Sequence, residues 1–236
     1  MTFHPDLVEA VVFDLGGVFI YPDPHPAAER MAATGVPVPS GDDFDQRFRR
    51  AHHAAVHHLS QDGEDAAEHR PEFWRRYDRA YGADLGVPDE QLDDFDVAIR
   101  VGWDWPHEPN IAALHRLATT GMPMAIVSNN DGSAPEQCRT HGICQVLEGP
   151  LPVVAAIIDS ALVGARKPDP TIMAPALYAL GIPAERVLYV GDTVQADVLA
   201  ATRAGMQVVQ LDPFDHHAAF DHARMNDVDE IVDALT

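Results

Sequence analysis

The feature that most constrains this fold is a short apolar run, residues 10–13, which ends abruptly in Asp14 and two glycines. Strands buried on both faces of a parallel sheet have continuous apolar sequences of this length. The run would place Asp14 at the carboxyl end of a central strand, the edge of an α/β sheet where ligands bind. Gly16 and Gly17 would let the backbone turn tightly beside it. Taken alone, the stretch is equally compatible with an ordinary turn that begins at an aspartate.

Further strand patterns, separated by helical patterns, predict the rest of a sheet. The predicted strands are residues 122–127, 187–190 and 207–211, and a weaker candidate, whose alanines disfavour a strand, is residues 153–158. Strands that alternate with helices form parallel sheets joined by right-handed crossovers. We therefore predict an α/β fold with a Rossmann-like parallel sheet flanked by helices.

A long insertion separates the first strand from the second. Residues 25–105 have helical patterns only, and three prolines in residues 21–26 argue against any regular strand or helix at that point. The sequence therefore predicts an α/β core domain of residues 1–18 and 107–236, with an inserted all-α domain of residues 19–106.

The composition excludes several classes of partner. The chain has 37 acidic and 16 basic residues, and its formal net charge of −21 repels nucleic acid and anionic membranes. We find no apolar run long enough to span a membrane and no basic segment of a signal peptide. Cys138 and Cys144 form neither a disulfide framework nor a zinc pattern. We expect a cytoplasmic monomer or homodimer without nucleic-acid or membrane partners.

Polar side chains follow the predicted strands at matching ends. These residues are Asp14 after the first strand, Ser128 and Asn129 after the second, and Asp192 and Asp197 after residues 187–190. Because parallel strands end at one edge, these groups can converge. Two or three carboxylates without a histidine or cysteine partner suit a hard cation, for which Mg²⁺ is the usual choice beside phosphate. A bound cation would also attract an anionic substrate to an acidic protein.

Lys167 is the single lysine of the chain, and the other fifteen basic residues are arginines. The use of lysine at this one position is either chance or a sign that the position needs a compact ammonium, because a planar guanidinium would not fit there. Lys167 and Ser128 can donate to phosphate oxygens. A carboxylate that faces a metal-held phosphate is a competent nucleophile, so the pattern favours phosphoryl transfer to Asp14.

Four segments in order resemble the haloacid dehalogenase-like hydrolases. They are residues 13–18, 126–129 and 166–170, and Gly191-Asp192 with Asp197. The helices inserted after the first segment resemble that family's C1-type cap. The resemblance implies a Mg²⁺-dependent hydrolase, in the first place a phosphatase of a small phosphorylated metabolite.

The resemblance also implies a role for each site residue. Asp14 would be the nucleophile, through an aspartyl-phosphate, and Mg²⁺ would be held by Asp14, the Gly16 carbonyl and Asp192. Lys167 would be both catalytic and a phosphate ligand, and Asp197 would support Lys167 or a metal-bound water. The implied phosphate ligands are Ser128, Asn129, Lys167 and Gly17.

One position departs from the family pattern. Family phosphatases carry a second aspartate two residues after the nucleophile, where this chain has Gly16. That aspartate is a general acid and base, help that is typically worth about 10²–10⁴ in rate. We expect a site that binds metal but favours good leaving groups, or one that takes its acid from elsewhere. His25 and the histidines of residues 52–58 are candidates, although such a cluster is more often a solvated helix face.

Two alternatives remain open. Gly16 also suits a phosphate-binding or interaction protein with weak or no catalysis. The second is a haloacid dehalogenase, which works without a metal and does not need Gly191-Asp192. The presence of Gly191-Asp192 argues against a dehalogenase, although Gly16 leaves it possible. The phosphonate-cleaving branch of the family needs a cap lysine, and the inserted segment has none.

Overall fold

The computed structural model describes residues 3–41, 43–60, 71–99 and 102–236. The chain divides into two compact units, which we call the core unit (Met1–Phe19 and Pro106–Thr236) and the insert unit (Ile20–Trp105). No helix among the described residues has both the length and the apolarity needed to cross a bilayer.

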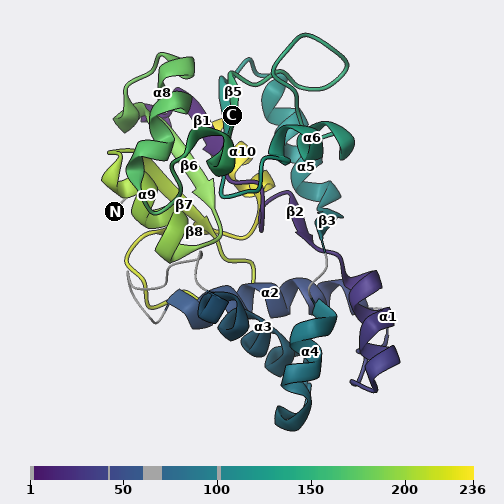
Figure 1. The fold of residues 1–236 in the computed structure, drawn as a ribbon. Helices are drawn as coiled ribbons and strands as arrows, with labels where there is room; N and C mark the ends of the chain where they lie inside the picture. Colours follow the sequence, from purple (N-terminus) through teal and green to yellow (C-terminus); the bar gives the residue numbers. More distant parts are fainter. Residues whose placement is uncertain (1–2, 42, 61–70, 100–101) are drawn as a thin grey trace. The chain divides into compact units, whose positions relative to one another are not determined.

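The core unit is built on a six-stranded parallel sheet, as the sequence predicts (Figure 1). Its strand order is β5-β4-β1-β6-β7-β8, so β1 and β6 are central. All residues of β1, β4, β6 and β7 are buried, which explains why β1, β4 and β6 are largely apolar rather than alternating. β7 is buried as well, although it contains Gln207 and Gln210. The strands are β1 (Ala10–Phe13), β4 (Met124–Ser128), β5 (Ala156–Asp159), β6 (Val187–Gly191), β7 (Gln207–Leu211) and β8 (Ala223–Met225).

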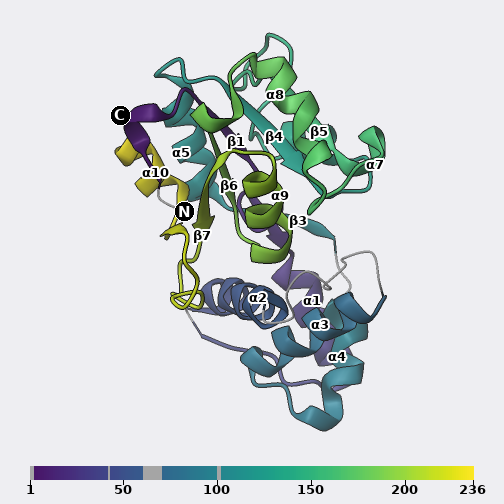
Figure 2. The same ribbon diagram turned by 90° about the vertical axis from the view of Figure 1, so that its left-hand side faces the viewer.

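Helices cover both faces of this sheet, which gives the predicted Rossmann-like layers (Figure 2). α8 and α9 pack on one face, where Val12 and Val127 share an apolar cluster with Ala176 and Ala200. α5 and α10 pack against each other on the opposite face. The helices are α5 (Glu108–Ala118), α6 (Ala134–Thr140), α7 (Ser160–Val163), α8 (Ala174–Leu180), α9 (Leu199–Arg203) and α10 (Val228–Leu235).

Two details of the predicted sheet are wrong. The strand expected over residues 153–158 is Ala156–Asp159, and Val153 forms only an isolated bridge with Gln145. β8 was not predicted, because a three-residue edge strand that is only partly buried leaves no apolar run in the sequence.

The insert unit is mainly helical. The apolar stripes of its helices meet in one core, in which Phe48, Tyr81 and Phe95 are almost completely buried. Those stripes therefore serve packing, as helical spacing predicts. The helices are α1 (Pro24–Thr34), α2 (Phe44–Ser60), α3 (Pro71–Leu85) and α4 (Leu92–Ile99).

The insertion is not entirely helical, which corrects the prediction of an all-α segment. Its two ends form a two-stranded sheet of β2 (Ile20–Pro22) and β3 (Trp103–Pro106). The prolines at residues 21–26 do not prevent regular structure. Pro22 ends a short edge strand, and Pro24 begins α1, whose first backbone N–H groups need no helical acceptor.

Candidate active site

Asp14 follows β1 at the carboxyl edge of the sheet, as predicted. Its backbone N–H donates to the carbonyl of Val190 in the neighbouring β6, 2.8 Å away, so the strand ladder fixes its position. Its side chain is 10% exposed, and Oδ1 lies 2.8 Å from Nζ of Lys167. The structure thus brings together the predicted nucleophile and the single lysine.

The Lys167 ammonium is buried between two carboxylates. Its Nζ lies 2.8 Å from Asp14, 2.6 Å from Asp197 Oδ1 and 3.1 Å from the Tyr189 hydroxyl. Burial by itself lowers the pKa of Lys167, but Asp14 and Asp197 outweigh it, and the net pKa is raised. The ammonium therefore keeps its charge in the buried site.

Asn129 clamps the backbone of Lys167. The Lys167 N–H donates to Asn129 Oδ1 over 2.8 Å, and Asn129 Nδ2 donates back to the Lys167 carbonyl over 3.1 Å. The side chain of Asn129 is thus engaged in placing the lysine. Only its main chain remains a candidate for the phosphate contact that the sequence suggests.

Asp197 accepts four hydrogen bonds. Oδ1 accepts from Lys167 and from the Tyr189 hydroxyl at 2.9 Å, and Oδ2 accepts from the backbone N–H and the hydroxyl of Thr193 at 2.9 and 2.6 Å. Burial raises the pKa of Asp197, but Lys167 and Thr193 outweigh it and hold the pKa below its usual value. Because both oxygens are used, the geometry suits support of Lys167 better than metal binding.

Two glycines make room for the carboxylates. A Cβ on Gly17, whose φ is +70°, would lie 2.2 Å from Asp192 Oδ2. A Cβ on Gly191 would lie 2.4 Å from Asp197 Cγ. The two acids therefore occupy space that any other residue at positions 17 and 191 would fill.

The acidic residues fit a divalent cation. Asp14, Asp192 and Asp197 bring carboxylate oxygens within 4.8 Å of one another, and all three side chains are buried. Three carboxylates and one ammonium leave a formal charge of −2. Burial raises the pKa of Asp14 well above its usual value, and the opposing effect of Lys167 does not cancel this. An oxygen-binding cation of charge +2 would restore neutrality, and Asp14 and Asp192 are the carboxylates suited to hold it.

Ser128 ends β4 at the same sheet edge and is 4% exposed. Within the described residues its hydroxyl makes no hydrogen bond. Buried hydroxyls are normally satisfied, so this one is available to a ligand. Gly16 lies between Asp14 and Gly17 in the loop after β1 and, unlike Gly17, has no positive φ.

Sequence reasoning missed three polar residues near the site. Tyr189 lies inside the apolar run of β6. Its hydroxyl needs a hydrogen-bond partner when buried, and this could have marked it as a residue near the polar site. Thr193 holds Asp197 as the N-cap of the π-helical turn Val194–Val198. Gln195 in that turn is 3% exposed, and its amide has no partner among the described residues. Such turns frequently occur at functional sites, which makes Gln195 a candidate ligand contact.

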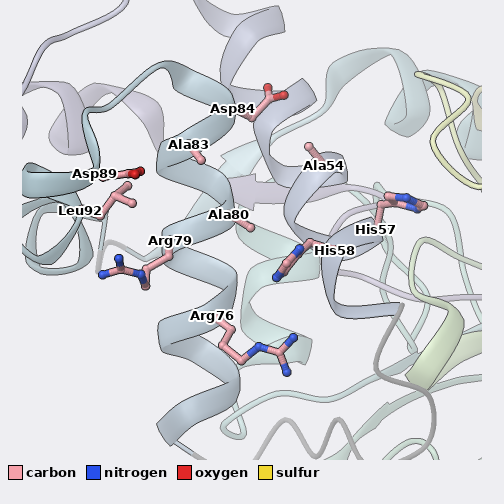
Figure 3. Close-up of a pocket in the computed structure, with 10 residues that line it drawn as sticks. All are labelled: Ala54, His57, His58, Arg76, Arg79, Ala80, Ala83, Asp84, Asp89 and Leu92. Atoms are coloured by element: carbon pink, nitrogen blue, oxygen red, sulfur yellow. The ribbon is translucent and has the colours of Figure 1, made fainter.

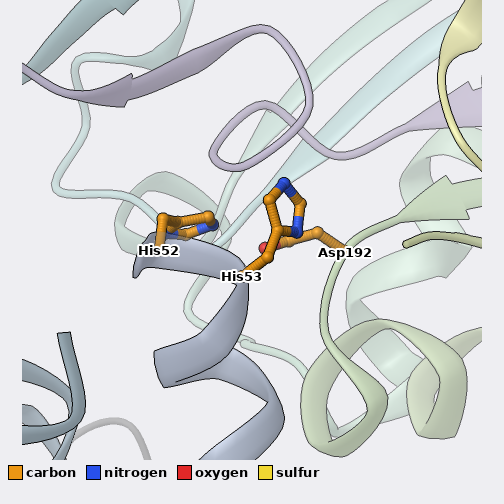
Figure 4. A group of neighbouring side chains, drawn as sticks. All are labelled: His52, His53 and Asp192. Atoms are coloured by element: carbon orange, nitrogen blue, oxygen red, sulfur yellow. The ribbon is translucent and has the colours of Figure 1, made fainter. Parts of the chain in front are cut away.

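Two of the histidines of α2 are buried in the interior of the protein. His52 and His53 are adjacent and buried, contrary to the expectation of a solvated helix face (Figure 4). Within the insert unit, His52 Nδ1 lies 2.6 Å from the Tyr77 hydroxyl and His53 Nε2 lies 3.3 Å from that of Tyr21. Asp192, also labelled in Figure 4, belongs to the core unit.

A pocket of about 690 Å³ lies in the insert unit beside α2 and α3 (Figure 3). Two arginines and two aspartates balance each other in its lining, so its formal charge is zero when the histidines are neutral. Arg79 pairs with Asp93 outside the lining, at 2.9 Å. This charge balance does not select an anion. The polar lining residues are His57, His58, Arg76, Arg79, Asp84 and Asp89.

Comparison with known proteins gives matches along most of the chain. A family model described as haloacid dehalogenase-like hydrolase matches residues 8–205. The chain is 29% identical to phosphoglycolate phosphatase of Pseudomonas fluorescens over 220 residues, which cover 89% of this chain and 71% of that protein. It is 38% identical to glyceraldehyde 3-phosphate phosphatase of Methanopyrus kandleri over 55 residues, 23% of this chain and 24% of that protein.

A solved structure extends the likeness to the fold. The crystal structure of 2-haloacid dehalogenase from Pseudomonas syringae pv. Tomato matches with a TM-score of 0.53. The match covers 97% of this chain and 98% of that one at 20% identity. At this identity the likeness concerns the fold alone.

Substitution of Gly17 should cost more stability than its positive φ explains. Gly164 has a similar φ of +73° but open space around the position of a Cβ. We expect Gly164→Ala to cost about 1–2 kcal/mol, the strain of a left-handed alanine. Gly17→Ala adds the clash with Asp192 and should cost more. Chemical denaturation of both variants measures this, and equal losses would contradict the close packing of Asp192 on Gly17.

Proposed function

The chain belongs to the haloacid dehalogenase-like hydrolases, and on that premise we propose that it is a Mg²⁺-dependent phosphatase of a small phosphorylated metabolite. The observation that carries the proposal is the buried contact of 2.8 Å between Asp14 and Lys167 at the sheet edge. A nucleophilic carboxylate beside a fixed ammonium suits a phosphoryl group, which needs attack at phosphorus and positive charge at its oxygens. Two relatives that are named phosphatases support this choice.

Mg²⁺ would be held by Asp14, Asp192 and the Gly16 carbonyl. When bound it would neutralise phosphoryl charge and keep Asp14 ionised, whose pKa is otherwise raised by burial. The site's excess of negative charge is the observation that supports this assignment.

In the proposed reaction, a carboxylate oxygen of Asp14 attacks phosphorus while the bond to the leaving oxygen breaks. The product is an aspartyl-phosphate, which water then hydrolyses to restore Asp14 and release phosphate. Hydrogen-bond donors fixed before the reaction stabilise the charge on the phosphoryl oxygens. The proposed donors are the Lys167 ammonium, the Ser128 hydroxyl, and the main chain of Gly17 and Asn129.

Gly16 shapes the proposed substrate range. With no carboxyl group at this position, protonation of a poor leaving group lacks the family's usual acid. Acyl phosphates and sugar 1-phosphates, whose leaving groups depart more readily, are therefore the proposed substrates.

We further propose that residues 1–18 and 107–236 are the catalytic domain and that residues 19–106 are a C1-type cap that selects the substrate. The protein is proposed to be a cytoplasmic monomer or homodimer. The acidic composition supports the absence of nucleic-acid and anionic-membrane partners.

Replacement of the nucleophile should abolish turnover. We expect Asp14→Asn to lose hydrolysis of p-nitrophenyl phosphate and acetyl phosphate with Mg²⁺, because an amide cannot attack phosphorus. Asp6→Asn, an exposed change before the same strand, is the control and should retain activity. Phosphate release measures both. Undiminished turnover by Asp14→Asn would refute the assignment of the nucleophile.

The same assay separates the alternatives. If the unmodified chain binds phosphate but turns over no activated phosphate, it is a binding protein. If it releases halide from a 2-haloacid without Mg²⁺, and Asp14→Asn stops this, it is a dehalogenase.

Restoring the second aspartate should extend the substrate range. The φ of Gly16 is not positive, so an L-residue there adds no left-handed backbone strain. We expect Gly16→Asp to raise kcat for alkyl phosphates by about 10²-fold or more, and to change acetyl phosphate turnover much less. Gly16→Asn is the control without an acid. Equal rates for the two variants on alkyl phosphates would mean that leaving-group protonation is not limiting.

Stabilisation by Mg²⁺ should grow with pH. The raised pKa of Asp14 means that metal-free protein loses stability as pH rises through that pKa, because a buried carboxylate that Lys167 only partly compensates must ionise. Mg²⁺ relieves this at high pH and competes with the proton at low pH. At about 100 times its Kd, Mg²⁺ should raise Tm by about 5–10 °C near pH 8. Thermal unfolding should show a smaller rise near pH 5. A rise independent of pH would contradict Mg²⁺ binding to Asp14.

A further inference from the structure

Gln210 is a fully buried polar residue within β7. It pairs with Gly191 across the ladder between β7 and β6, and its neighbours Val209 and Leu211 are apolar core residues. Burying an amide without hydrogen bonds costs roughly 1–3 kcal/mol in proteins. The position therefore has a polar task that an apolar strand residue could not perform.

Both ends of the Gln210 amide are bonded. Nε2 donates to the main-chain carbonyl of Asp192 over 2.8 Å, and Oε1 lies 2.6 Å from Nε2 of His222. A carbonyl oxygen only accepts, so the amide nitrogen must face Asp192 and the amide oxygen must face His222. His222 must then carry a proton on Nε2. These contacts, all within the core unit, fix the orientation of the amide.

The His222 ring is itself held in place. It packs on Phe220 at a centroid distance of 5.9 Å, and Phe220 packs on His217 at 5.5 Å. His217 donates its backbone N–H to the buried carboxylate of Asp212, 2.8 Å away. Burial is the main cause that lowers the pKa of His222 to about 4, and the positive charge of Arg224 acts in the same direction, so its neutral ring donates to Gln210 at neutral pH.

A hydrogen bond to the main-chain carbonyl of Asp192 can fix the direction in which the Asp192 side chain points. Asp192 follows the last residue of β6, where the sheet ladder no longer fixes the backbone, and its carboxylate lies against Gly17. A hydrogen bond to its carbonyl holds the peptide plane that follows and with it the direction of the Cα–Cβ bond. Groups that orient a metal ligand in this way typically change metal affinity 10–100-fold when removed.

We propose that Gln210 is a positioning residue that holds Asp192 in its metal-binding orientation, and that His222 fixes the Gln210 amide for this task. The inference rests on the proposed Mg²⁺ site. It predicts a defect in Mg²⁺ binding itself, beyond any loss of stability.

The test is titration calorimetry of Mg²⁺ into the full chain. Gln210→Met keeps the length and burial of the side chain but has no donor, and its Kd for Mg²⁺ should rise at least about 10-fold. Gln207→Met is the matched control on the same strand, because Gln207 bonds the Glu185 carbonyl and the His4 N–H instead. It should lose stability in thermal unfolding but keep the unmodified Kd. His222→Phe, which retains the ring packing, should raise Kd by a smaller factor.

Each outcome is decisive. An unchanged Kd in Gln210→Met, or an equal rise in Gln207→Met, overturns the positioning role. If Gln210→Met does not fold, His222→Phe decides, and an unchanged Kd in that variant overturns the role. If the unmodified chain binds no Mg²⁺, the proposed metal site is wrong and this inference falls with it.

Discussion

The site depends on one buried ammonium. Lys167 lies between Asp14 and Asp197 at 2.8 and 2.6 Å, where three carboxylates would otherwise face one another without compensation. Leaving a buried charge unpaired typically costs about 3–5 kcal/mol. The surrounding structure accordingly fixes this group from two sides, through the Asn129 clamp on its backbone and the Tyr189 hydroxyl at its tip.

The remaining charge explains why a cation and a phosphoryl group suit the site together. One ammonium cannot balance three carboxylates, so the formal charge of these four groups is negative and favours a divalent cation. With a cation present, the edge of the sheet becomes able to accept an anion despite a net charge of −21. The negative net charge, which would repel nucleic acid, is thus compatible with an anionic small molecule at this edge.

The parts that could be predicted from the sequence are those with a local signal. β1 and β7 were predicted with their observed bounds, β1 because buried parallel strands are continuously apolar. Asp14, Ser128 and Asp192 were predicted to lie near one edge because each ends such a run. β2 and β8 are only three residues long, and β3 and β8 are only partly buried, so none of them leaves a clear apolar pattern. Proline does not exclude the start of α1, where Pro24 is the first residue.

The supporting residues could not be found in this way. Tyr189 and Gln210 lie inside apolar strands, where a polar side chain looks like a tolerated exception until its partner is known. Their partners, Asp197 and Asp192, are brought near by the pairing of β6 with β7 and by the turn after β6. Only the three-dimensional arrangement shows that these exceptions hold the acidic residues of the site.

The most direct test of the account is to trap the covalent intermediate. After incubation with acetyl phosphate and Mg²⁺, borohydride reduction converts an aspartyl-phosphate into homoserine, which peptide mass spectrometry can locate. The account predicts this conversion at residue 14 alone. Turnover without any modification at Asp14, or with modification at another acidic residue, would contradict it.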